Sequence, residues 1–162
     1  MRIGILSDTH DKLERTRVAV QILCDGGAEV LFHCGDLATP PIVEACSCRP
    51  CYFTFGNHDA DDVPALQKAA ADFGVTCLGW GDIVEMSGKR LGLVHGHLTT
   101  DLRRVIALQP DYLFSGHSHE RNDAQVGAIR RINPGALHRA GEFSVAIVDL
   151  EADSVQFLSV PR

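Results

Sequence analysis

Five short segments of this chain carry side chains that bind metal ions or move protons. They contain Asp8 and His10, then Asp36, then Asn57 and His58, then His95 and His97, and finally His117 and His119. Each segment follows an apolar run of the kind that forms a buried strand. Unpaired buried carboxylates and imidazoles are costly, so a shared cation is the simplest explanation. The ligand types, without thiolates, suit Mn, Fe, Zn or Ni rather than a structural cysteine-type zinc site.

The spacing within two segments supports a common ion. Asp8 and His10 are two residues apart, as are His117 and His119. In an extended segment such residues point to the same side, so each pair can reach one ion. Two ions would need a carboxylate between them, and Asp36 is the natural candidate.

The segment Gly56-Asn57-His58-Asp59 ends the apolar run over residues 51–55. We expect Gly56 to allow a sharp turn where a side chain would clash. Open α/β sheets bind ligands beyond the carboxyl ends of their strands, so the tetrad should lie at the rim of a sheet.

The elements that would position these segments alternate between strand and helix at first and become strand-rich after residue 120. The expected strands cover residues 2–6, 29–32, 51–55, 75–78, 82–86, 90–94, 111–114, 124–126, 128–132, 143–150 and 154–160. Helices are expected between them, within residues 11–26, 40–45, 62–73 and 100–106. This order predicts an α/β fold, a four-layer sandwich of two mixed β-sheets packed face to face with helices outside.

Local patterns predict several details of these elements. Asp11 and Glu14 have the spacing of a capping box. Leu66 and Phe73 belong to one apolar helical face, which Gly74 should end. A hairpin turn is expected at Gly88-Lys89.

Composition limits the class of protein. The chain has 162 residues, which predicts a single domain over residues 1–162. A formal charge of −6 argues against nucleic acid as a stable partner. No stretch approaches the roughly 20 apolar residues that cross a bilayer. The first residues do not resemble a secretory signal, so we expect a cytoplasmic protein with its six cysteines reduced. The sequence predicts no particular oligomeric state.

The ordered series Asp-x-His, Gly-Asp, Gly-Asn-His-Asp, His and Gly-His-x-His, over residues 8–119, resembles the signature of the calcineurin-like metallophosphoesterase superfamily. Asn133-Pro134-Gly135, followed by the strand over residues 143–150, resembles its small bacterial and archaeal phosphodiesterase branch. The resemblance covers nearly the whole chain. It implies a divalent-metal-dependent phosphodiesterase acting on a small phosphodiester. A phosphomonoesterase, including a phosphoprotein phosphatase, is the alternative within enzymes. A non-catalytic scaffold of the same fold and a metal-storing protein are the alternatives outside them.

The resemblance also implies roles for the residues. The first ion would be held by Asp8, His10 and His119, the second by Asn57, His95 and His117, with Asp36 bridging both. His95 is preferred to His97 because the lone histidine of the family falls directly at the strand end. His97 is then left with a supporting role or none. The expected cofactors are two divalent ions, with Mn favoured and Fe, Zn or Ni as alternatives.

Two such ions lower the pKa of a bridging water, and the hydroxide would attack phosphorus in line. Asn57 would help to neutralise the developing charge, and His58 would stabilise the transition state or protonate the leaving group. The sequence departs from the phosphoprotein phosphatases at Thr39, where they have an aspartate that orients the histidine. Asp59 is a substitute partner for His58. No arginine that grips phosphate can be assigned.

The remaining histidines and cysteines have simpler interpretations. His33 is predicted to be a core histidine. His138 and Arg139 follow the Asn-Pro-Gly turn, and of the two interpretations, a contact with substrate and a solvated loop, we favour the solvated loop. Cys46, Cys48 and Cys51 would need a fourth ligand to form a zinc site, so we interpret them as ordinary thiols.

Overall fold

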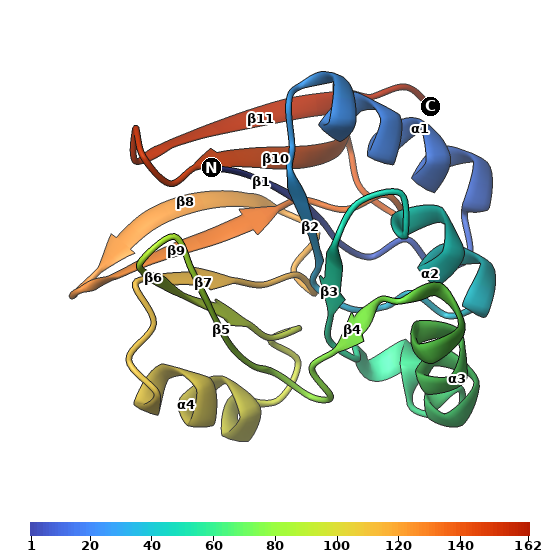
Figure 1. Cartoon of the computed structure of the whole chain (residues 1–162), viewed down its shortest axis with the longest axis horizontal. Coiled ribbons are helices and arrows are strands. Elements are labelled where there is room, and N and C mark those ends of the chain that lie inside the picture. Colours follow the sequence, from blue (N-terminus) through green and yellow to red (C-terminus); the bar gives the residue numbers. More distant parts are fainter.

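The computed structural model describes residues 1–162 and contains two mixed β-sheets (Figure 1). Their strand orders are β11-β10-β1-β2-β3-β4 and β5-β6-β7-β9-β8. The first sheet contains β1 (Arg2–Leu6), β2 (Val30–His33), β3 (Cys51–Phe53), β4 (Thr76–Cys77), β10 (Phe143–Asp149) and β11 (Ser154–Val160). The second contains β5 (Asp82–Met86), β6 (Lys89–Leu93), β7 (Tyr112–Phe114), β8 (Arg121–Val126) and β9 (Ile129–Pro134).

Helices cover the outer faces of both sheets. The first sheet is covered by α1 (Leu13–Asp25), α2 (Pro40–Cys46) and α3 (Val63–Phe73), and the second by α4 (Thr99–Ala107) (Figure 1). The largest core cluster, with 22 buried residues, lies under α1–α3, and a cluster of 13 that includes Phe32 and Phe114 lies between the sheets. The predicted four-layer α/β sandwich is therefore confirmed.

The strand directions explain why the candidate ligands meet. In the first sheet β1, β2 and β3 are parallel neighbours, and in the second β6 and β7 are parallel neighbours. The five segments with candidate ligands directly follow these five strands. Because parallel strands have their carboxyl ends at one edge, each sheet delivers its polar loops to a single rim.

Several local expectations were wrong. α1 starts at Leu13 without a side-chain cap, and Asp11 instead accepts a hydrogen bond from the Thr39 hydroxyl at 2.6 Å. Phe73 is 40% exposed: it is the last residue of α3, and the buried face of this helix ends at Ala70. The hairpin turn consists of Ser87-Gly88, both with positive φ (51° and 72°), as a two-residue type I′ loop requires.

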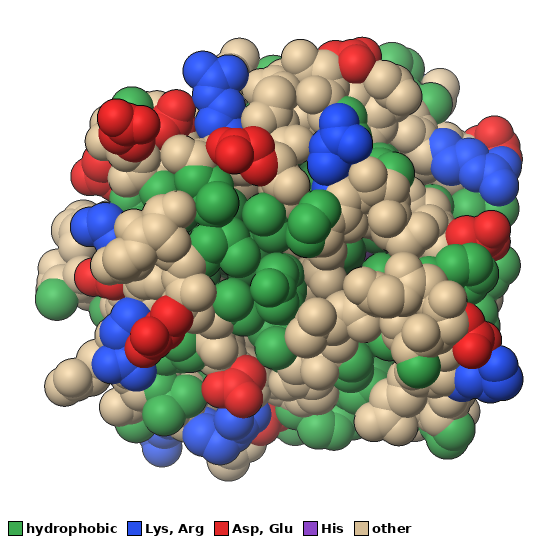
Figure 2. Space-filling model, viewed as in Figure 1, with side chains coloured by type: hydrophobic (Ala, Val, Ile, Leu, Met, Phe, Trp, Pro, Cys, Tyr) green, Lys and Arg blue, Asp and Glu red, His purple; other side chains and the backbone are tan.

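Hydrophobic side chains gather near the middle of one face of the molecule, between the two sheets (Figure 2). At its margin the inter-sheet core is flanked by partly buried side chains such as Tyr52, Val84 and Met86. Hardly any histidine is visible on this face (Figure 2). None of the helices has the length and apolar character needed to cross a membrane.

Candidate metal centre

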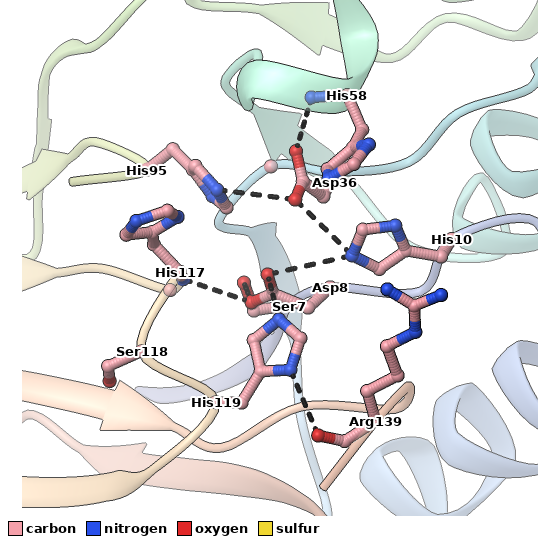
Figure 3. Close-up of polar contacts among 12 residues, drawn as sticks. Ser7, Asp8, His10, Asp36, His58, His95, His117, Ser118, His119 and Arg139 are labelled. Atoms are coloured by element: carbon pink, nitrogen blue, oxygen red, sulfur yellow. Dashed lines mark hydrogen bonds and ion pairs between the residues drawn. The ribbon is translucent and has the colours of Figure 1, made fainter. Parts of the chain in front are cut away.

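The loops after β1, β2, β3, β6 and β7 bring carboxylates and imidazoles together into overlapping groups (Figure 3). Three groups have ligand atoms within 4.8 Å of one another: Asp8, His10 and His119; His10, Asp36 and His58; and Asp8, Asp36 and His95. Since the groups share Asp8, His10 and Asp36, they form one continuous cluster that spans both sheets.

The first part of the cluster is built on the buried Asp8. Its Oδ1 lies 3.0 Å from His119 Nε2 and 3.9 Å from His10 Nε2. Its Oδ2 accepts hydrogen bonds from the Ser7 hydroxyl (2.5 Å) and from the backbone N–H of His117 (3.1 Å). The carboxylate is thus held by one oxygen while the other faces the two imidazoles.

Asp36 connects the two parts of the cluster. Its Oδ2 lies 3.3 Å from His10 Nε2 and 3.4 Å from His95 Nε2, and its Oδ1 accepts the backbone N–H of His58 at 2.9 Å. Burial disfavours the charged carboxylate, but the adjacent imidazoles of His10 and His95 outweigh this effect and hold the pKa of Asp36 well below its usual range. Asp36 is therefore an anion that faces both His10 and His95.

His95 and His119 are oriented through their other ring nitrogens. His95 Nδ1 donates to the backbone carbonyl of Cys34 (2.8 Å), and His119 Nδ1 donates to that of Arg139 (3.3 Å). A carbonyl only accepts, so in the neutral rings each Nε2 carries the lone pair and is free to bind a metal. His95 Nε2 also lies 3.2 Å from Asn57 Oδ1, and the His117 ring centre is 5.2 Å from that of His95.

Two buried atoms of the cluster make no hydrogen bond: Asp8 Oδ1 and His10 Nε2. Buried polar atoms in folded proteins are nearly always satisfied, so these two need a partner. A cation between them would accept both lone pairs, and carboxylate, amide and imidazole ligands suit Mn, Fe, Zn or Ni. The residues therefore fit a divalent metal centre.

The backbone is strained where these side chains project. Five of the seven candidate ligands have φ in the left-handed region: Asp8 (54°), His10 (42°), Asp36 (59°), His117 (69°) and His119 (59°). This conformation is uncommon for residues with a side chain, and such strain persists where surrounding contacts enforce it.

Gly56 is required for a different reason than the predicted turn. Its φ of −103° and ψ of 179° are extended backbone that any residue adopts. A Cβ at this position would instead collide with the carboxylate and backbone of Asp36. Gly56 therefore lets the loop after β3 approach the loop after β2.

His58 lies at the edge of the cluster, with its ring centre 4.8 Å from that of His10 (Figure 3). The Asp59 carboxylate does not support it. It accepts hydrogen bonds from the backbone N–H groups of Asp36, Gly56 and Ala38 and forms none with the His58 ring. Asp59 therefore positions Asp36, a role that sequence reasoning missed.

Asn133 is a second positioning residue that sequence reasoning missed. Its buried amide donates to the carbonyl of Gly116 (2.9 Å) and the hydroxyl of Ser118 (3.1 Å), which fixes the loop that carries His117 and His119. The Asn-Pro-Gly turn was visible in the sequence, but only the fold shows which loop it meets.

His138 and Arg139 line the central cavity, contrary to the expectation of a solvated loop. This cavity of about 290 Å³ is lined by His10, Asp36, Asn57, His58, His117, His119, His138 and Arg139. The His138 ring lies 4.8 Å from the His10 ring, and the Arg139 guanidinium points toward His10 without forming an ion pair (Figure 3). The cavity thus contains one arginine, Arg139, for which the sequence favoured only a solvated loop.

His33 and the cysteines lie outside the cluster. The fully buried His33 accepts the N–H of Gly35 at Nδ1 and bonds the Thr9 hydroxyl through Nε2, as expected for a core histidine. Burial lowers its pKa to about 3. Cys46 and Cys51 are core thiols, and none of the candidate ligand groups contains a cysteine.

Comparisons with known proteins agree with this geometry. Residues 1–153 match the model of the calcineurin-like phosphoesterase superfamily domain. A phosphodiesterase of Methanocaldococcus jannaschii is 31% identical over 157 residues, which cover 93% of this chain and 94% of that protein. The solved structure of an archaeal phosphodiesterase matches with a TM-score of 0.87 and 28% identity, over 99% of this chain and 100% of that one.

A more distant structure shares the fold. The Escherichia coli phosphoesterase YfcE matches with a TM-score of 0.70 and 20% identity, over 99% of this chain and 100% of that one. The chain belongs to the calcineurin-like phosphoesterase superfamily, a family of metal-dependent phosphoester hydrolases. The family resemblance seen in the sequence is confirmed.

Proposed function

We propose that this member of the superfamily is a phosphodiesterase that holds two divalent ions in one domain over residues 1–162. The observation that carries the proposal is the position of Asp36, whose Oδ2 lies 3.3 Å from His10 and 3.4 Å from His95. A carboxylate facing two imidazoles from opposite sides suits a bridging ligand. The first ion would be held by Asp8, His10 and His119, and the second by Asn57, His95 and His117. We favour Mn because the ligand set mixes oxygen and nitrogen.

Bound ions of this kind polarise phosphoryl oxygens and lower the pKa of water. The protein's own groups would hold the substrate. The Arg139 guanidinium lines the central cavity and can donate charge-assisted hydrogen bonds to a non-bridging phosphoryl oxygen. With Asn57 Oδ1 directed toward His95, its amide NH₂ remains free to donate to the charge that develops on the phosphoryl group.

His58 would donate a proton to the leaving oxygen. Its side chain is exposed at the cavity wall, while its backbone N–H is held by Asp36. The backbone of His58 is therefore fixed, while its ring stays exposed to a substrate in the cavity. A positioned imidazole of this kind contributes to catalysis as a general acid.

A diester is favoured over a monoester by the surroundings of the central cavity. It shares His117 with a neighbouring cavity of about 340 Å³ and Asn57 with another of about 480 Å³. A phosphodiester carries two organic groups, and a phosphate held centrally could direct one to each side. The phosphodiesterase relative from Methanocaldococcus jannaschii supports the same choice.

The test is hydrolysis of bis(4-nitrophenyl) phosphate by the metal-stripped chain, with Mn added back. We expect activity to return with two ions bound per chain. Asp36→Asn should lower activity about a hundredfold or more. Asp61→Asn, an exposed aspartate near the site, is the matched control. Circular dichroism would show that both variants are folded.

Other outcomes would redirect the proposal. Faster hydrolysis of 4-nitrophenyl phosphate than of the diester would indicate a phosphomonoesterase. Two bound ions without turnover of either ester would favour the non-catalytic scaffold.

A further inference from the structure

A cavity of about 480 Å³, which we call the Trp80 cavity, opens beside the central cavity. It is lined by Asn57, Ala60, Trp80, His97, Leu98 and Asp101. The two cavities share Asn57, so a ligand whose phosphate lies at the metal centre can extend directly into the second space. Ligand pockets of this volume are typical for small molecules.

The Trp80 cavity differs in chemistry from the central one. The central cavity is lined by histidines and charged or amide side chains, with no hydrophobic residue. The Trp80 cavity presents an indole and Leu98, which is 47% exposed. The indole is held by Phe55 and His97, with ring centres 5.4 and 5.9 Å away. A partly exposed, buttressed indole is a ready stacking surface for a flat ring.

The polar groups of the Trp80 cavity select among flat rings. Asp101 brings the one carboxylate of the lining, and its Oδ1 also lies 3.6 Å from the guanidinium of Arg104, which is not itself part of the lining. A carboxylate accepts hydrogen bonds from amino and ring N–H groups. The His97 imidazole lines the same space. An aromatic ring with N–H donors, such as a nucleobase, can both stack on the indole and donate to the carboxylate.

We propose that the Trp80 cavity binds the nucleobase of one ester arm, which makes nucleoside phosphodiesters the substrate class. This inference rests on the proposed phosphodiesterase function, because it requires the phosphate at the metal centre. The base would stack on Trp80 and donate to Asp101. The second ester group would extend from the opposite side of the phosphate.

A binding experiment tests the cavity without turnover. Trp80 is the only tryptophan of the chain, so indole fluorescence reports on this cavity alone. We expect adenosine 5′-monophosphate to change the fluorescence of the Mn-loaded protein saturably. Ribose 5-phosphate, which lacks the base, should not. Equal responses to the two probes, or no response to either, would overturn the inference.

A kinetic experiment tests the same contact with two diesters that share a leaving group: the 4-nitrophenyl ester of thymidine 5′-monophosphate and methyl 4-nitrophenyl phosphate. Stacking on an aromatic side chain predicts that Trp80→Ala raises KM for the thymidine diester by about fivefold or more and leaves that for the methyl diester nearly unchanged. Trp80→Phe should retain most of the preference. Because Trp80 also packs on Phe55, Leu98→Ala serves as a second variant, with a smaller loss in the same direction.

The outcomes separate this inference from the proposed function. If both diesters are hydrolysed and Trp80→Ala changes the two KM values equally, the nucleobase site is contradicted and the phosphodiesterase function is not. Hydrolysis of neither diester by the unmodified chain would contradict the phosphodiesterase, and the fluorescence titration would then decide on the cavity by itself.

Discussion

The carboxylate of Asp59 accepts a hydrogen bond from the backbone N–H of Asp36, with 2.9 Å between Oδ2 and N. The same carboxylate accepts the N–H groups of Gly56 (2.8 Å) and Ala38 (2.7 Å). The loop after β3 therefore fixes the loop after β2, and the position of the proposed bridging carboxylate depends on a buried side chain that does not line the cavity.

Asp59→Asn should weaken the metal centre without removing a proposed ligand. One of its two acceptor oxygens becomes an NH₂ group facing backbone donors, and each unsatisfied buried group costs about 1–3 kcal/mol. We expect a loss of that size in the free energy of unfolding and weaker Mn binding by calorimetric titration. Asp61→Asn is the control. Unchanged stability and Mn affinity in Asp59→Asn would contradict the positioning role.

His58→Gln should separate proton donation from metal binding. A general acid matters most when the leaving group is a strong base. We therefore expect kcat to fall about a hundredfold or more for an alkyl leaving group, and far less for 4-nitrophenolate. The metal content should be unchanged by elemental analysis. His138→Gln, the neighbouring histidine of the same cavity, should not show this dependence. A lower metal content in His58→Gln would make His58 a ligand instead.

Arg139→Gln should impair substrate binding more than the chemical step. Hydrogen bonds to charged groups contribute about 1.5–3 kcal/mol, which corresponds to roughly a 10- to 150-fold loss in kcat/KM. Most of the loss should appear in KM for a diester, and Arg139→Lys should recover part of it. Arg103→Gln, an exposed arginine on α4, is the control. Equal KM values for Arg139→Gln and Arg103→Gln in steady-state kinetics would contradict a contact between Arg139 and the phosphate.

His33 should remain neutral in the folded protein well below its ordinary pKa. Burial lowers its pKa from 6.5 to about 3, so the unfolded chain binds a proton between these values that the folded chain does not. This linkage makes stability fall as pH falls below 6.5, with a slope of up to about 1.4 kcal/mol per pH unit from this group. Nitrogen NMR of the His33 ring should show no titration between pH 8 and 5. A midpoint near 6.5 would contradict this prediction.

The proposed ligands were predictable because they directly follow the apolar runs that form the strands. Asp8 and His117 each follow a short continuous apolar run, and its length, together with the turn residues after it, indicates a buried strand. The two-sheet architecture was predicted from the same runs. Strands and helices alternate in the first part of the chain, and the additional strands of the last part need a second sheet. The parallel pairing of β6 with β7 then brought the second set of loops to the site.

The supporting residues were not predictable because their partners are distant in sequence. Asn133 reaches Gly116 and Arg139 reaches the central cavity only after β9 and the loop before β10 are in place. Gly56 was identified correctly as necessary but for the wrong reason, because a collision with Asp36 depends on how closely two loops approach. The Asp11–Glu14 pattern failed since Thr39, from another loop, binds Asp11 instead.

The left-handed backbone at Asp8, Asp36 and His117 has an evolutionary consequence. A glycine adopts this conformation without the steric cost that a side chain brings, so we expect glycine at these positions to stabilise the fold at the expense of hydrolysis. A lineage that abandoned catalysis would lose this constraint first at these positions. Glycines replacing the aspartates and histidines, on an otherwise intact sandwich, would then mark descendants in which the fold alone is under selection.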